Sequence, residues 1–142
     1  MRARLPHMNP MVEVELARII INETSDQQYI WVREKNGSRE FPIVISIWEA
    51  MAIDRFVKEQ ETARPLTHEL LHSTIGALGG EVSRVEVTQL KGGTFYANLV
   101  LARNGAEVAV DARPSDAIAI AVRSGSPLYV HEDVIDEVSA PG

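Results

Sequence analysis

The chain has 142 residues, of which 45% are hydrophobic and 24% charged, with no cysteine and a formal net charge of −6. This length suits one domain with a sizeable core, and the longest apolar run, Ala117 to Val122, falls far short of the roughly 18 residues of a membrane span. The lack of cysteine excludes disulfides, thiolate metal sites and cysteine nucleophiles, and we expect a cytoplasmic protein. The acidic charge excludes a generally basic surface, so any DNA or RNA contact is expected at a local site.

The N-terminal segment has neither the apolar stretch nor the small-residue cleavage site of a signal peptide. We expect residues 1–10 to form a disordered tail, residues 11–138 a single domain, and residues 139–142 a second tail. The alternative starting residues are Met1, Met8 and Met11.

Two parts of the chain, about residues 12–60 and 85–125, repeat one order of patterns. Each has an alternating strand, a second apolar strand that leads to an Asn-Gly pair, a third strand and a helix. The matching segments are Val12–Leu16 with Val85–Leu90, Tyr29–Val32 with Tyr96–Leu99, Glu40–Ile45 with Glu107–Asp111, and Trp48–Ile53 with Ser115–Ile120. Because Asn-Gly favours type I′ hairpin turns, Asn36-Gly37 and Asn104-Gly105 predict two hairpins.

The starts of the two repeated helices carry different signals. Ser46, with Glu49 three residues later, predicts a capping box in which each side chain satisfies a free backbone amide. In the second repeat we expect Arg113 at the N-cap. Pro114 then takes the first helical position, where its missing N–H costs nothing, and Asp116 the third, where a carboxylate suits the helix dipole.

A further helix is predicted between the repeats, over Thr67–Leu78, with Thr67 as its N-cap and Gly79-Gly80 as its stop. A short C-terminal helix is expected around Glu132 to Val138. The sequence therefore predicts an α+β fold: a duplicated β-β-β-α unit that forms a mixed or antiparallel sheet, with helices packed on it and an extra helix between the repeats. The alternative is that the two amphipathic stretches resemble each other by coincidence.

Two segments place Ala-Arg-Pro at a helix start, followed by a hydroxyl and a carboxylate. These segments are Ala63–Glu69 and Ala112–Asp116. Free N–H groups and a guanidinium fork together match a phosphate, so Arg64, Thr67 and Arg113 are candidate phosphate-binding residues. The alternative is that each arginine pairs with the carboxylate of its own segment and the proline only sets the helix entry.

A pair of carboxylates could hold a metal ion. Asp111 closes a strand and Asp116 opens the next helix, so a short turn can bring both to one edge of the sheet. Mg²⁺ or Mn²⁺ suits such a pair, with waters and substrate phosphate completing its coordination. The alternative is that Asp116 only caps its helix. Asp111 ends an apolar strand, so it risks partial burial and would then need a partner such as Arg113.

His68 and His72 stand four residues apart in His-Glu-Leu-Leu-His, which contains the letters of a zinc protease motif. Such a site needs a third ligand downstream, and the one later histidine, His131, lies by an acidic segment. The favoured interpretation is one histidine at a helix start and the other on a solvated face. Gly79-Gly80 and Gly92-Gly93 lack the longer glycine pattern of a nucleotide fold, so no organic cofactor is expected.

Several aromatic side chains lie within strand or helix patterns, where core packing is the expected role and base stacking the alternative. They are Trp31, Phe41, Trp48, Phe95 and Tyr96.

Five motifs in order resemble the bifunctional nuclease domain family. They are Phe41–Ile45, Trp48–Ile53, Arg64–Leu71, Gly93–Ala97 and Asp111–Ala119, within a resemblance that runs from about Met11 to Val138. The family name rests on combined DNase and RNase activity of plant members. The resemblance therefore implies a nuclease that hydrolyses phosphodiester bonds of DNA or RNA with a divalent metal.

On this hypothesis Asp111 and Asp116 hold the metal, Arg64 and Arg113 neutralise the phosphate, and His68 acts as acid or base. The candidate catalytic residues are therefore His68, Asp111, Arg113, Ser115 and Asp116, and the remaining chemistry-bearing residues of the matching motifs are Thr67 and Glu69. The alternative is a non-enzymatic module that binds an anionic metabolite or serves as an oligomeric scaffold, which the net acidity favours. We expect a homo-oligomer and no membrane partner.

Overall fold

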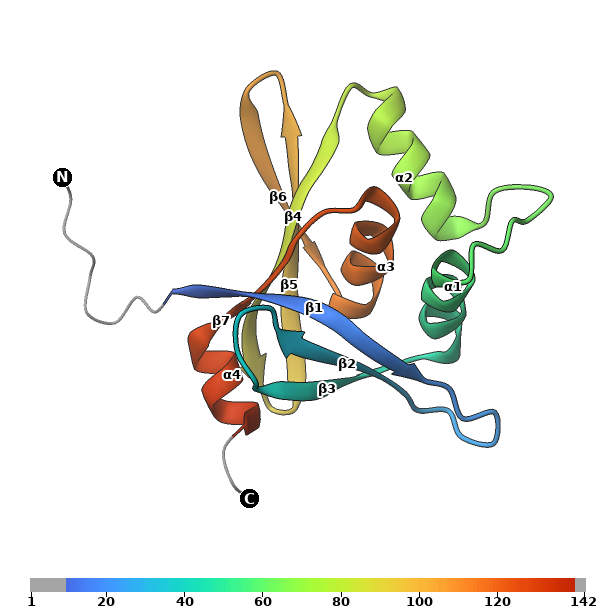
Figure 1. Cartoon of the computed structure of the whole chain (residues 1–142). Helices are drawn as coiled ribbons and strands as arrows, with labels where there is room; N and C mark the ends of the chain where they lie inside the picture. The colour runs from blue at the N-terminus through green and yellow to red at the C-terminus, as the bar shows by residue number, and fades with distance from the viewer. Residues whose placement is uncertain (1–9, 140–142) are drawn as a thin grey trace, which may run out of the picture.

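A sheet of seven strands runs through the computed structural model, which describes residues 10–139 (Figure 1). In chain order the elements are β1 (Met11–Ile20), β2 (Gln28–Glu34), β3 (Glu40–Ile45), α1 (Ile47–Val57), α2 (Thr67–Ala77), β4 (Glu81–Lys91), β5 (Thr94–Arg103), β6 (Ala106–Ala112), α3 (Pro114–Ser124), β7 (Leu128–His131) and α4 (Glu132–Ser139). The strand order is β3-β2-β1-β7-β4-β5-β6. Neighbouring strands are antiparallel except for the parallel pair β4 and β7, so the sheet is mixed.

The predicted α+β class is confirmed, and so is the order of elements. Strands β1 to β3 form one antiparallel meander followed by α1, strands β4 to β6 form another followed by α3, and α2 lies between them in the chain. Strand β7, which was not predicted, separates β1 from β4 and joins the two meanders. The internal duplication stays a prediction. Of the expected tails at residues 1–10 and 139–142, only Pro10 and Ser139 are among the described residues, and Ser139 is the last residue of α4 and not part of a tail.

Both predicted hairpins form, because β2 pairs with β3 and β5 pairs with β6 in antiparallel fashion. Asn104 and Gly105 have φ values of 52° and 78°, as a type I′ turn requires. At Asn36-Gly37 the predicted turn type is wrong, because Gly37 has no positive φ and the loop between β2 and β3 is wider. In this loop the Glu34 amide donates to the Arg39 carbonyl oxygen at 2.9 Å, and the Glu34 carboxylate holds the Arg39 side chain.

The first two helix caps differ from the prediction. Ser46 is the N-cap of α1, but its hydroxyl donates to the Glu49 carboxylate instead of accepting a backbone amide, so the predicted capping box is wrong. Helix α2 has Leu66 as its N-cap, one residue before the predicted Thr67. The Leu66 amide donates to Glu69 Oε1 at 3.0 Å, which satisfies one of the free donors at this helix start.

The α3 start agrees with the prediction: Arg113 is the N-cap, Pro114 occupies the first position, and Asp116 lies in the first turn. The C-terminal helix is also confirmed, as α4. The helices are 8 to 11 residues long, and within residues 10–139 none combines the length and apolar character needed to cross a membrane.

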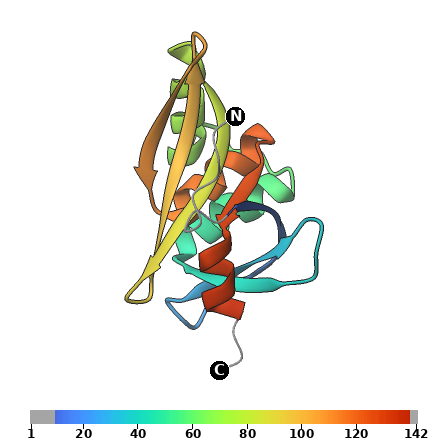
Figure 2. The same cartoon turned by 90° about the vertical axis from the view of Figure 1, so that its left-hand side faces the viewer.

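The core lies between α3 and the curled sheet. Helices α1, α2 and α3 gather on one side of the molecule, and α3 is buried along most of its length (Figure 1). Its alanines, Ala117, Ala119 and Ala121, are all buried, and such small side chains let a helix approach the strands closely. The two meanders run across each other (Figure 2). The rings of Phe41 on β3 and Phe95 on β5 stack at 6.3 Å although these strands are far apart in the sheet order, so the sheet must curl.

Helix α4 is fastened to the β2–β3 loop by the Arg39 guanidinium. Its nitrogens lie 2.7 Å from Glu34 Oε1, 2.9 Å from Glu132 Oε1 and 3.1 Å from Asp136 Oδ1. These hydrogen bonds raise the pKa of Arg39 and lower that of Glu34. Because Glu132 and Asp136 belong to α4, one side chain joins elements that are almost a hundred residues apart in the chain.

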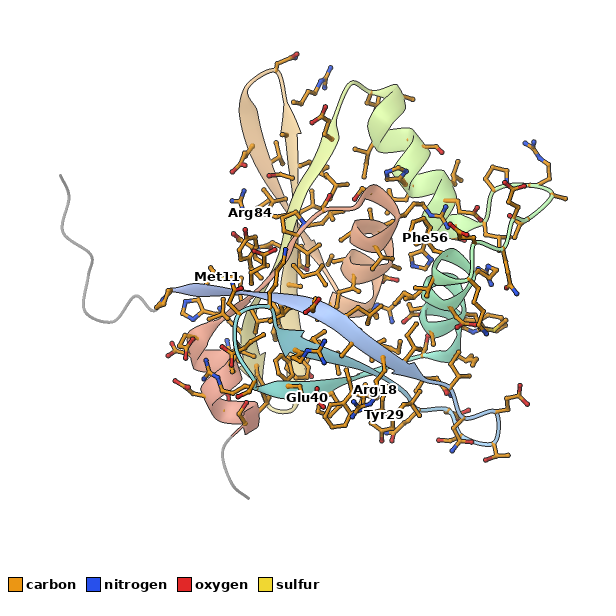
Figure 3. The ribbon with its side chains drawn as sticks, in the orientation of Figure 1. Met11, Arg18, Tyr29, Glu40, Phe56 and Arg84 are labelled. Carbon is orange, nitrogen blue, oxygen red and sulfur yellow. The ribbon has the colours of Figure 1, made fainter. Side chains whose placement is uncertain are left out.

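We expect Arg39→Ala to lower the free energy of unfolding by about 1–2 kcal/mol, because three carboxylates lose a partly solvent-screened partner. Urea unfolding measures this loss. The control is Arg18→Ala. Arg18 on β1 pairs at 3.3 Å with Glu40 on β3 (Figure 3) and lies over the Trp31 ring, and for the loss of these two contacts about 0.5–1 kcal/mol is expected. Equal losses for both variants would contradict the role of Arg39.

Candidate functional site

The first turns of α1, α2 and α3 meet at the end of β6 around an open cleft of about 690 Å³. Its lining residues are Trp48, Glu49, Thr67, His68, Leu71, Leu99, Val110, Asp111, Ala112, Arg113, Asp116, Ala117 and Ile120. Helix starts carry unpaired N–H groups and a partial positive charge. Three helix starts, which come from distant parts of the chain, therefore contribute first-turn residues to one cavity.

Asp116 is the centre of a charged cluster in this cleft. Its Oδ1 lies 2.9 Å from His68 Nε2 on α2, and its Oδ2 lies 2.8 Å from an Arg113 guanidinium nitrogen. The His68 hydrogen bond, together with that of Arg113, holds the pKa of Asp116 below its usual 3.8, and Asp116 raises the pKa of Arg113. Asp116 is thus ionised at neutral pH and orients both an imidazole and a guanidinium.

Glu49, predicted from the sequence only as a capping residue, is a buried member of the same network. Its side chain is 5% exposed and lies 3.4 Å from Arg113. The Ser115 hydroxyl donates to Glu49 Oε1 at 3.1 Å, and the Ser46 hydroxyl donates to Glu49 Oε2. The network therefore links α1 to α3. A Ser-x-x-Glu pattern is typical of helix starts in general, so nothing in the sequence separated this glutamate from an ordinary cap.

The predicted site residues are only partly brought together. His68, Asp116, Arg113 and Thr67 share the cleft, whereas Ser115 is buried and turned toward Glu49, where its hydroxyl is already donated. Ser115 thus supports the network from behind the cleft. Arg113 does pair with its own Asp116, as the alternative interpretation held, but its side chain remains 66% exposed and can still receive a ligand.

Arg64 and Asp111 depart from the expected arrangement. Arg64, a predicted phosphate ligand, is exposed and does not line the cleft. The alternative, in which Arg64 pairs with Glu69, is also wrong, because Glu69 accepts from Leu66 and Thr62 and lies 3.8 Å from Arg123. Asp111 lines the cleft but is exposed, so the expected burial is wrong. In the described part of the chain Asp111 forms no ion pair with Arg113.

The His-Glu-Leu-Leu-His segment does not form a zinc pair in this fold. His68 directs Nε2 to Asp116, whereas His72 lines a different cavity beside Ile75 and Val82. Among residues 10–139 there is no group of three or more histidine, aspartate or glutamate side chains placed to hold a metal ion. His68 does lie at a helix start, as the favoured interpretation held, whereas His72 is half-buried and does not lie on the expected solvated face.

The aromatic side chains divide between core and surface. Phe41 is 2% exposed and packs on Phe95, as expected for core residues. Trp31 on β2 is half-buried beneath the Arg18 guanidinium, which lies 4.5 Å from its ring centroid. Trp48 is instead 73% exposed and lines the cleft, so the expected core role is wrong for this residue.

Lowering the pH tests the charged cluster. Because the pKa of Asp116 is depressed in the folded chain, its ionisation stabilises the fold above the ordinary value of 3.8, and this contribution is lost as the pH falls through the depressed pKa. We expect Asp116→Asn to lower the urea midpoint at about pH 5 and the difference from the unaltered chain to shrink by about pH 3. A difference that stays constant over this range would show that the carboxylate charge contributes nothing.

Comparisons with known proteins give a consistent family. The family model described as the bifunctional nuclease domain matches residues 30–141. An uncharacterized protein of Mycobacterium tuberculosis is 43% identical over 125 residues, which cover 88% of this chain and 74% of that protein. Bifunctional nuclease 2 of Oryza sativa is 30% identical over 80% of this chain, and bifunctional nuclease 1 of Arabidopsis thaliana is 32% identical over 64% of it. The chain spans only 36% and 29% of these two plant proteins.

Proposed function

The chain belongs to the bifunctional nuclease domain family, and on this premise we propose that it hydrolyses phosphodiester bonds of DNA or RNA in the cleft at the starts of α1, α2 and α3. One observation carries the proposal. The Asp116 carboxylate holds an imidazole that can transfer a proton and an exposed guanidinium that can bind a phosphate in the same open cleft. The names of the plant relatives support this choice of substrate.

Arg113 is the proposed phosphate ligand. Its guanidinium is tied to Asp116 at one edge and is 66% exposed, which leaves donors free for a second partner. A planar guanidinium matches two oxygens of a phosphate and stabilises the negative charge that develops on it in the transition state. The buried Glu49 behind Arg113 fixes the position of this arginine relative to α1.

His68 is the proposed acid or base. The ionised Asp116 favours the tautomer in which Nε2–H donates to Oδ1, so the lone pair lies on Nδ1. Within residues 10–139 no hydrogen bond occupies Nδ1. His68 can therefore take a proton from an attacking water or ribose hydroxyl at Nδ1 and return it to the leaving oxygen.

The charge of the cleft supports a role for a divalent cation. Its lining has three carboxylates, Glu49, Asp111 and Asp116, against the one guanidinium of Arg113, so a phosphodiester there meets net negative charge. Oxygen ligands suit Mg²⁺ or Mn²⁺, which commonly use one or two protein carboxylates with waters and substrate oxygens. We propose Asp111 as the main ligand, joined by Asp116 through a lone pair that its hydrogen bonds from His68 and Arg113 leave open. A bound ion would offset the repulsion and polarise the phosphate.

Removing the metal tests this part of the proposal. We expect cleavage of single-stranded DNA or RNA by the purified chain to stop in EDTA and to return with excess Mg²⁺ or Mn²⁺. Asp111→Asn should raise the Mg²⁺ concentration needed for half-maximal rate, because the ion loses a charged ligand. Cleavage that continues unchanged in EDTA would overturn the metal assignment while leaving the roles of His68 and Arg113 open to their own tests.

A non-enzymatic scaffold remains the second candidate, and it too has a specific observation. Among the described residues of α2 none is buried, and Leu70 on the helix and Leu78 at its C-cap are 58% and 63% exposed, which is unusual for a helix without a partner. On this proposal the cluster around Asp116 only ties α2 to α3, and the exposed leucines support a homo-oligomer. If the chain is a scaffold, changes at His68 should alter its stability, and the unaltered chain should show no phosphodiester hydrolysis.

A further inference from the structure

Trp48 is exposed at a position where the fold gives it no packing role. It is the second residue of α1, whose buried side is formed by Ala50 and Ile53, and it is 73% exposed. Met51, three residues later and thus on the same side of the helix, is 40% exposed. A large aromatic side chain left in water on a short helix adds nothing to the core, so its place in the cleft calls for a ligand.

The surroundings of Trp48 indicate which ligand that is. It lines the cleft together with Leu71 of α2 and Val110 of β6, which are 44% and 42% exposed and form apolar walls. The same cleft contains Arg113, and the residue after Trp48 is Glu49, which lies 3.4 Å from that guanidinium. The flat apolar ring of Trp48 and the guanidinium of Arg113, the proposed phosphate-binding residue, thus line one cleft. A nucleotide likewise carries its base close to its phosphate.

We propose that Trp48 stacks on an unpaired nucleobase of the substrate while Arg113 binds the neighbouring phosphate. The inference rests on the proposed function and deepens it, because it assigns single-stranded nucleic acid as the substrate class. Stacking on an aromatic ring accepts any base, since every base has a π-face, so the subsite selects unpaired strands and not a sequence. It also supplies affinity without positive charge, which a chain of net charge −6 needs.

The two tryptophans of the chain allow a matched fluorescence test. In Trp31→Phe only Trp48 emits, and in Trp48→Phe only Trp31 emits, which lies on β2 beneath Arg18. We expect a single-stranded oligonucleotide to quench Trp48 and not Trp31, and an abasic strand of equal length and charge to quench neither. Equal quenching of Trp48 by both strands would overturn the proposal. So would emission that shifts to the blue with protein concentration alone, because a second copy would then cover Trp48.

Kinetics separate this inference from the proposed function. We expect Trp48→Ala to raise KM for single-stranded substrate roughly tenfold with little change in kcat, whereas Val57→Ala, an exposed change at the other end of α1, leaves KM unaltered. If cleavage depends on His68 but KM does not respond to Trp48→Ala, the stacking proposal fails and the nuclease proposal stands. If bases quench Trp48 but no cleavage occurs, the nuclease proposal fails and the stacking site stands.

Discussion

His68→Ala should reduce phosphodiester cleavage by about 100- to 10,000-fold, the usual contribution of a positioned acid or base. The imidazole is 18% exposed and oriented by Asp116 at 2.9 Å, so its removal leaves the carboxylate paired with Arg113 alone. The loss should appear mainly in kcat, because the proton transfer takes place in the transition state. Measurement of kcat and KM on a labelled single-stranded oligonucleotide gives this split.

The matched control for His68 is His72→Ala. His72 lies one turn further along α2 and lines another cavity, so the same change of residue type on the same helix should leave cleavage intact. Urea unfolding of both variants would show that neither change prevents folding. A similar fall in activity for the two variants would mean that α2 acts through its packing and not through the His68 imidazole.

Arg113→Ala should reduce cleavage by about 100- to 1,000-fold, because the developing charge on the phosphate loses its donor. Since the Arg113 side chain is 66% exposed, its pair with Asp116 is screened by solvent, whereas the buried Glu49 loses its nearby cation, so urea unfolding of the variant has to show that it still folds. Arg113→Lys should recover only part of the rate. A lysine keeps the positive charge but lacks the planar fork.

Arg64→Ala is the informative comparison for Arg113. Both arginines stand in Ala-Arg-Pro segments, which the sequence analysis treated as equivalent phosphate sites, whereas only Arg113 lines the cleft. The structure therefore predicts that Arg64→Ala keeps the activity of the unaltered chain. Equal losses at both positions would restore the two-site hypothesis and contradict the cleft assignment.

Local sequence signals predicted much of the fold, and they failed where contacts between distant parts of the chain are involved. Arg113, Pro114 and Asp116 occupy their predicted places because cap chemistry depends on neighbours in the sequence. The turn at Asn36-Gly37 differs from the prediction: Glu34 and Arg39 pair across a wider loop, and Arg39 also binds α4, almost a hundred residues away. Strand β7 has only four residues, and it is held in place by pairing with β1 and β4. Four residues are too few to show a period by themselves.

The sequence predicted the types of residue in the site but not which of the candidate residues come together in the cleft. Hydroxyl, carboxylate and guanidinium groups at helix starts indicated an anion site, and Asp116, Arg113 and His68 do meet there. The 48-residue separation of His68 and Asp116 is closed only when α2 packs on α3, which no local pattern encodes. The exposure of Trp48 likewise depends on how α1 turns relative to the sheet, so its place in the cleft emerged only from the fold.

The most direct test of the cleft as a nuclease centre is single-turnover cleavage by the unaltered chain and by His68→Ala, purified side by side and supplied with Mg²⁺. We expect the unaltered chain to cut single-stranded oligonucleotide and the variant not to cut it. Added imidazole should restore cutting by the variant, because the small base enters the space left by the side chain. Equal cleavage by both preparations, or none by the unaltered chain, would contradict the account.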